Sequence, residues 1–202
     1  MEEVLHALAG DYADTEVMRN VFANQTPRYG NDDDYADALM QRISSLFIDA
    51  VDGLPHTKGA FYRIDMLPTT CHIYFGQVTG ATSDGRHAHT PLSEGISAVQ
   101  GADRNGPTAA VKSAGKMEHT RTCGTLLNMK LTPSVIKTDE DLRKLASLVR
   151  TYFRFGGHHI QFNIVGTDTL LEAQEKPQEY RDLIVRVAGY SALFTTLSKS
   201  LQ

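Results

Sequence analysis

The chain has 202 residues, of which 20 are Lys or Arg and 24 are Asp or Glu, so its formal net charge is −4. Apolar residues make up 41% of it, a balance that excludes a disordered, collagen-like or coiled-coil polypeptide. No run of Lys and Arg could form a phosphate-binding patch, which argues against a nucleic-acid partner. The apolar stretches are too short to span a membrane, and the first residues are acidic where a secretory signal would be basic. The 2 cysteines are too few for a disulfide framework. We therefore expect a cytoplasmic protein without a membrane partner.

Residues 1–52 are predicted to be helical. Asp32, Asp33 and Asp34 supply a cap and acidic first-turn residues for the last helix of this part. Gly53 ends that helix, with Pro55 shortly after it. Its apolar residues recur at helical spacing, at Leu39, Ile43, Leu46, Phe47 and Ala50.

Residues 54–135 have a different character. The runs 60–64 and 72–75 look like short strands. Residues 79–108 are dense in Gly, Pro, Asn and Asp, which predicts a loop region. A loop of this length within a compact domain is uncommon and is usually functional.

The last third is regular again. Thr138 caps a helix that ends at Gly156, and residues 159–165 alternate polar and apolar, as a half-buried strand does. A second helix opens at Thr167, residues 184–187 form a short strand-like run, and Leu193, Leu197 and Leu201 favour a helix over 192–202. Strands that alternate with helices indicate an α/β fold.

Histidine and cysteine pairs provide the first candidates for chemistry. None of these pairs continues into the spacing of a zinc site, and adjacent His158 and His159 on a strand would point to opposite faces, so we expect no metal. Cys71 and Cys123 each have a histidine nearby in sequence, but lone cysteines are most often buried for packing, so we predict that both are structural and buried.

Residues 184–191 place Gly189 between an apolar run and an aromatic residue, which by itself indicates a tight turn with positive φ. The same segment matches the Arg-Val-x-Gly-Tyr-Ser/Ala signature of glycyl radical enzymes, the superfamily of pyruvate formate-lyase and of radical dehydratases and decarboxylases. Further stretches resemble motifs of that family in the same order, namely residues 27–33, 79–86, 91–97, 106–109, 124–128 and 159–163. The chain therefore resembles the C-terminal part of such an enzyme, closer to the dehydratase and decarboxylase branch.

This resemblance implies a function for Gly189, which would carry a protein-derived radical after an activating enzyme that uses S-adenosylmethionine and an iron–sulfur cluster removes a hydrogen atom from its Cα. No bound cofactor is implied. The neighbours Arg186, Val187, Tyr190 and Ser191 would form the radical loop, with Val187, Tyr190 and Leu193 as its walls. We expect Gly189 at the tip of a buried loop between the strand-like run and the helix over 192–202.

The resemblance also implies what is missing. Family enzymes are several times longer, form barrels wrapped in helices and pass the radical to a cysteine in a Gly-Cys-x-Glu loop, a context that neither Cys71 nor Cys123 has. Residues 1–78 would be the last portion of the barrel domain, and residues 79–202 the glycine-radical domain. The cysteine would then lie in a missing N-terminal part or a partner subunit, and the full enzyme would be a homo-oligomer. The alternatives are a stand-alone spare part that restores an oxygen-damaged enzyme, and an inactive truncated fragment.

Overall fold

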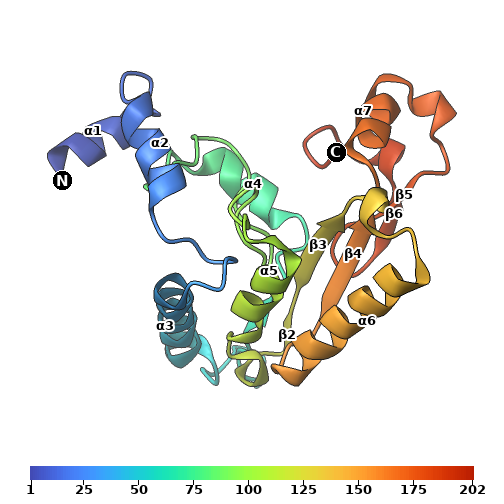
Figure 1. Cartoon of the computed structure of the whole chain (residues 1–202). Helices are drawn as coiled ribbons and strands as arrows, with labels where there is room; N and C mark the ends of the chain where they lie inside the picture. Colours follow the sequence, from blue (N-terminus) through green and yellow to red (C-terminus); the bar gives the residue numbers. More distant parts are fainter.

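The computed structural model describes all residues, 1–202, and begins with three helices that confirm the helical prediction for residues 1–52. The side chain of Asp33 caps the third helix by accepting a hydrogen bond of 3.0 Å from the backbone N–H of Ala36. The chain leaves this helix after Val51, as the glycine at position 53 predicts. The three helices are α1 (Glu2–Ala9), α2 (Glu16–Gln25) and α3 (Asp34–Val51), drawn in blue in Figure 1.

The apolar stripe of α3 is not in the core. Its inward face is formed instead by Asp37, Ser44 and Ile48, which are almost fully buried. The exposed fractions of the outward apolar residues reach 63% at Ile43 and 57% at Phe47. The exposed stripe consists of Tyr35, Leu39, Ile43, Leu46 and Phe47, and we call it the α3 face.

The two strands expected between residues 60 and 75 are wrong. Residues 60–64 make only a single bridge, from Phe61 to Pro55, and the true strand β1 (Asp65–Met66) follows them. Residues 72–75 lie inside the helix α4 (Cys71–Val78). A side chain at Gly76 would meet the Thr90 carbonyl oxygen at 2.3 Å, so contact with the distant loop determines how α4 packs.

The predicted loop is confirmed over residues 79–105, and a buried arginine organises its first part. The Arg86 guanidinium donates to the carbonyl oxygens of Gly80, His87 and Thr90, the last at 2.7 Å. The loop is shorter than expected because a helix that the sequence analysis missed begins within it. This helix is α5 (Gly106–Gly115), with Pro107 in its first turn.

A two-stranded parallel sheet forms the centre of the C-terminal half of the molecule (Figure 1), and we call it the central sheet. Strand β3 (Leu127–Leu131) pairs with β4 (Ile160–Ile164), and α6 (Asp139–Arg154) connects them, as the alternation and the Thr138 cap predict. Leu127, Met129, Ile160 and Phe162 pack on one face against the core that α5 and Tyr152 of α6 complete. The opposite face carries Asn128 and Lys130 on β3, and Gln161 and Asn163 on β4.

The residues after β4 form a helix and a hairpin, and the hairpin lies on that polar face. Helix α7 (Thr167–Glu175) is as predicted, and the run at 184–187 contains the strand β5 (Ile184–Arg186). The helix expected over 192–202 is wrong, because β6 (Ser191–Leu193) pairs antiparallel with β5. The other short elements are β2 (Gly124–Thr125), which pairs with β1, and the 3₁₀ turns His119–Arg121, Pro133–Val135, Pro177–Glu179 and Phe194–Thr196.

Candidate functional site

Gly189 lies at the tip of a tight hairpin. Strands β5 and β6 pair Arg186 with Ser191, and the backbone N–H of Val187 donates to the Tyr190 carbonyl oxygen at 2.9 Å, so only Ala188 and Gly189 remain in the turn. The φ angle of Gly189 is +74°, in the left-handed region that favours glycine. We call residues 184–193 the glycine hairpin.

Side-chain amides hold the glycine hairpin on the polar face of the central sheet. The Gln161 carboxamide donates from Nε2 to the Val187 carbonyl oxygen at 3.0 Å and accepts at Oε1 from the Gly189 N–H at 3.0 Å. Asn128 Nδ2 donates to the same carbonyl oxygen at 3.1 Å. We call Asn128, Gln161 and Asn163 the amide cluster; its third member binds the backbone of Arg186.

The tip of the hairpin faces solvent in this chain. Ala188 is buried, but Gly189 is exposed, and an added Cβ at Gly189 would meet no atom within 4 Å. The expected position at the tip is therefore right, whereas the expected burial is wrong. The expected walls are open for the same reason, since Tyr190 is 43% and Leu193 41% exposed. No segment of the chain covers this side of the turn.

Of the expected loop neighbours, Arg186 and Ser191 face each other across the two strands. Arg186 Nη1 donates to Ser191 Oγ at 3.1 Å. This contact joins the last residue of β5 to the first of β6 and helps to close the turn around Gly189. Val187 contributes its backbone, which makes the contacts described above.

A partly buried carboxyl group, that of Glu94, is linked to the amide cluster through Ser97. Ser97 Oγ accepts from the Asn128 backbone N–H at 3.0 Å and donates to Glu94 Oε2 at 3.2 Å. Burial raises the pKa of the Glu94 carboxyl above its ordinary value, although hydrogen bonds from Asn128 and Ser97 oppose this shift. The segment 94–97 can pack this closely on the sheet because residue 95 is glycine, where an added Cβ would meet the Leu126 carbonyl oxygen at 2.3 Å.

The sequence alone does not predict a functional role for the amide cluster, although its residues lie within stretches that resemble motifs of the family. The available signal was the alternation in residues 159–165, where amide side chains occupy the face opposite the apolar residues.

An acidic group of Asp32, Asp34 and Asp37 has the spacing of a cation site, but an ammonium group occupies its centre. Lys116 Nζ lies 3.0, 2.9 and 2.7 Å from oxygens of Asp32, Asp34 and Asp37. Burial lowers the pKa of Lys116, but the three carboxylates together outweigh this effect and raise the pKa above its ordinary value. We therefore interpret the group as an ion-pair network that joins α3 to α5.

The histidines and cysteines show no reactive pair. His119 is buried, with Nδ1 2.8 Å from Thr125 Oγ1 and Nε2 2.8 Å from the Ala114 carbonyl oxygen, a structural arrangement. Burial lowers its pKa below the ordinary value. Cys71 and Cys123 are both exposed, so their predicted burial is wrong. Each lies at the beginning of a short element near the surface, Cys71 as the first residue of α4 and Cys123 just before β2.

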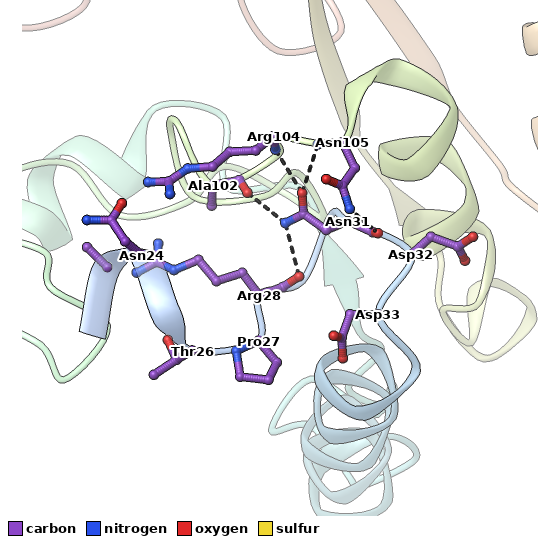
Figure 2. A pocket seen from close by; sticks show the side chains of 11 residues that line it. Asn24, Thr26, Pro27, Arg28, Asn31, Asp32, Asp33, Ala102, Arg104 and Asn105 are labelled. Carbon is purple, nitrogen blue, oxygen red and sulfur yellow. Dashed lines mark hydrogen bonds between the residues drawn. The ribbon is translucent and has the colours of Figure 1, made fainter. Parts of the chain in front are cut away.

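A polar pocket of about 360 Å³ lies between the segment that joins α2 to α3 and the loop before α5 (Figure 2). The Asn31 carboxamide crosses it, donating to the carbonyl oxygens of Arg28 and Ala102 and accepting from the backbone N–H groups of Arg104 and Asn105. All four contacts are to backbone groups. Asn31 therefore fixes two loops against each other.

Comparison with known proteins defines the family. Residues 92–195, more than half of the chain, match the family described as Glycine radical, and residues 1–76 match the family described as Pyruvate formate lyase-like. The chain belongs to the glycine radical family and, with it, to the glycyl radical enzymes.

Individual relatives place the chain in the dehydratase and lyase branch. It is 53% identical to trans-4-hydroxy-L-proline dehydratase of Clostridioides difficile, over 100% of this chain and 26% of the relative. It is 40% identical to isethionate sulfite-lyase of Oleidesulfovibrio alaskensis, over 100% of this chain and 25% of that relative. The crystal structure of hydroxyproline dehydratase from Clostridioides difficile, with trans-4-hydroxy-L-proline bound, superposes with a TM-score of 0.96 at 52% identity, covering 99% of this chain and 25% of that one. The chain thus spans about a quarter of the length of these relatives and corresponds to a fragment of a larger barrel protein. None of its helices combines the length and the hydropathy needed to span a membrane.

Proposed function

We propose that this chain is the C-terminal, radical-bearing part of a radical dehydratase or related lyase, and that Gly189 stores the radical. The observation that supports this most directly is the geometry of the turn in a member of the glycine radical family. The Gly189 backbone is held from one side by Gln161, while the space beyond its Cα is empty. A hydrogen atom on that carbon can be reached from outside without moving a side chain.

Glycine suits this chemistry because it has no Cβ, so a radical at its Cα can flatten. The amide nitrogen on one side and the carbonyl on the other then share the unpaired electron. In the proposed activation, a partner enzyme that uses S-adenosylmethionine and an iron–sulfur cluster breaks the Cα–H bond homolytically. The hydrogen atom moves to a radical fragment of S-adenosylmethionine, and the unpaired electron stays on Gly189.

Attack on a substrate requires groups outside this chain. We propose that the cysteine that receives the radical, and the residues that bind the substrate, lie in the part of the relatives' length that this chain does not span. Residues 1–78 would then complete a barrel domain, and residues 79–202 would form the glycine-radical domain. Cys71 and Cys123 do not carry the thiyl radical in this proposal.

The α3 face supports a larger partner. Five large apolar side chains on this helix are exposed to solvent. A contiguous apolar surface of this kind normally marks an interaction site. We propose that the rest of the barrel, in the same polypeptide or in a partner subunit, packs on this face, and that the complete enzyme forms homo-oligomers in the cytoplasm. A spare part that docks on a damaged enzyme would use the same face. The presence of an intact homologue in the same organism would favour the spare part over a piece of a divided enzyme.

The test is anaerobic incubation of the chain with the activating enzyme of a homologous dehydratase, S-adenosylmethionine and a reductant. Electron paramagnetic resonance should show a doublet from the single remaining α-hydrogen of Gly189, and no dehydration product should form. A doublet that persists in Gly189→Ala would refute the assignment of the radical. Dehydration of trans-4-hydroxy-L-proline by the 202-residue chain alone would refute the proposed division of roles.

A further inference from the structure

We propose that Gln161 is a positioning residue for the radical: its carboxamide fixes the peptide plane on the amino side of Gly189 and sets how much of the unpaired electron the Gly189 nitrogen shares. This inference rests on the proposed function of Gly189. It concerns a residue on the central sheet rather than in the signature segment. Gln161 would act on the Gly189 amide nitrogen, one of the two groups that share the unpaired electron.

The orientation of the Gln161 carboxamide follows from its partners. The Val187 carbonyl oxygen can only accept, and it lies 3.0 Å from Gln161 Nε2 and 3.1 Å from Asn128 Nδ2. Gln161 Nε2 also donates to Asn128 Oδ1. A rotated carboxamide would place oxygen against oxygen at both contacts, so Oε1 must face the Gly189 N–H.

Gln161 is also held rigidly. The residue is only 6% exposed, and it lies directly across the parallel pair of strands from Asn128, its register partner. The strand beneath is packed on the core through Ile160 and Phe162. A buried amide with all of its contacts satisfied keeps one orientation, so the Gly189 N–H meets an acceptor in a fixed position.

Only one of the two peptide planes that flank Gly189 is held in this way. Gln161 binds the N–H of the Ala188–Gly189 peptide, whereas the Gly189 carbonyl oxygen and the Tyr190 N–H make no hydrogen bond within the chain. At φ +74° the two planes are far from coplanar. A radical gains most delocalisation when the two peptide planes are coplanar. Flattening must therefore rotate the free Gly189–Tyr190 plane, while Gln161 holds the Ala188–Gly189 plane in place.

The hydrogen bond from the Gly189 N–H also has an electronic effect. An acceptor on an amide N–H increases electron density on the nitrogen, which makes the nitrogen a better donor to the electron-poor radical centre. Loss of the Gln161 acceptor should therefore reduce the spin on the Gly189 nitrogen and shorten the lifetime of the radical. A residue that merely packed the hairpin would not change the nitrogen coupling.

The first arm of the test needs no activation. Gln161→Met keeps the length and volume of the side chain and removes its hydrogen bonds, and Asn163→Ala is the matched control, because Asn163 holds the same hairpin at Arg186. Amide hydrogen exchange followed by NMR should show the Gly189 N–H exchanging about fivefold faster or more in Gln161→Met. In Asn163→Ala the acceleration should fall on the Arg186 N–H instead. If Gln161→Met does not fold, Asn128→Leu, which removes the group that orients Gln161, should give the same change at Gly189 to a smaller extent.

The second arm measures the radical in nitrogen-15-labelled chain after anaerobic activation. We expect a smaller nitrogen hyperfine coupling and a shorter half-life in Gln161→Met than in the parent, and a parent-like coupling in Asn163→Ala. Equal Gly189 exchange rates, or equal nitrogen couplings, in parent and Gln161→Met would overturn the role of Gln161 and leave the proposed function intact. Absence of a Gly189 radical from the parent chain would overturn both.

Discussion

Asn163 and Arg186 hold each other by two hydrogen bonds of 2.8 Å, one from Asn163 Nδ2 to the Arg186 carbonyl oxygen and one from the Arg186 N–H to Asn163 Oδ1. The carboxamide thus replaces the backbone of a neighbouring strand. Strand β5 has a backbone partner, β6, on one side only. The glycine hairpin is therefore attached to the central sheet through side chains.

Substitution Asn163→Ala should loosen this attachment. Two hydrogen bonds to the backbone are lost, so the free energy of unfolding should fall by about 1–2 kcal/mol, as measured by urea denaturation. The control is Gln178→Ala, an exposed glutamine outside the hairpin. Equal stability of the two variants would mean that the Asn163 contacts contribute nothing in solution.

Lys116 should contribute far more to stability than its neighbour Lys112. Lys116→Met leaves Asp37, which is 1% exposed, without its ammonium partner, and an unpaired buried charge costs about 3 kcal/mol. Lys112→Met removes an ion pair with Asp32 in which both side chains are partly exposed, and such a pair contributes less than about 1 kcal/mol. Urea denaturation of both variants at pH 7 tests the difference. Similar losses of unfolding free energy in the two variants would show that the buried Asp37 carboxylate does not make Lys116 more important for stability than Lys112.

Stability should fall on mild acidification because burial, complete at His119 and partial at His72 and His159, lowers the pKa of these histidines. Burial lowers the pKa of His119 below its ordinary value of 6.5, and the pKa values of His72 and His159 shift in the same direction. As the pH falls below about 6.5, the unfolded chain takes up protons that these folded histidines do not, so the unfolded state is favoured. Each histidine can contribute a slope of at most about 1.4 kcal/mol per pH unit.

His119→Gln isolates one part of this dependence, since glutamine offers a donor for the Ala114 carbonyl oxygen and an acceptor for Thr125, but does not titrate. The difference in unfolding free energy between parent and variant should therefore narrow from pH 8 to pH 5.5. A difference that stays constant over this range would contradict the assignment of a lowered pKa to His119.

The elements that were predicted correctly are those whose pattern is local. The Thr138 cap and the alternation at residues 159–165 depend on neighbours in sequence, and both appear as expected. The predictions for residues 72–75 and 192–202 failed because partners outside each segment decide its structure. Gly76 packs α4 against the backbone of Thr90, and the pairing of Ser191 with Arg186 overrides the helical spacing of the leucines that follow.

The candidate site was predictable only in part for the same reason. Gly189 could be identified because the signature around it is contiguous in sequence. Gln161 could not, because polar residues on alternate positions of a strand normally indicate a face exposed to water. Here that face is covered by residues much further along the chain. The stripe on α3 shows the converse case, since its spacing predicts burial that this chain alone does not provide.

Gly189→Ala should remove the radical without unfolding the chain. The φ angle of +74° is strained for any residue with a Cβ, but an added methyl meets no atom within 4 Å, so the cost should be only about 1 kcal/mol. Gly59 provides the matched control, with φ +79° and equally empty surroundings, outside the glycine hairpin. Both variants should lose similar stability in urea denaturation, which separates backbone strain from chemistry.

The two variants should then differ under activation conditions. In Gly189→Ala the methyl group replaces the hydrogen atom that points into the empty space beyond Cα, and it clashes with the neighbouring peptide groups when they become coplanar, so electron paramagnetic resonance should show no glycyl doublet. In Gly59→Ala the doublet should have the intensity of the parent. A doublet of equal intensity in all three proteins would place the radical on another residue, whereas its loss from both variants would show that strain elsewhere in the chain prevents activation.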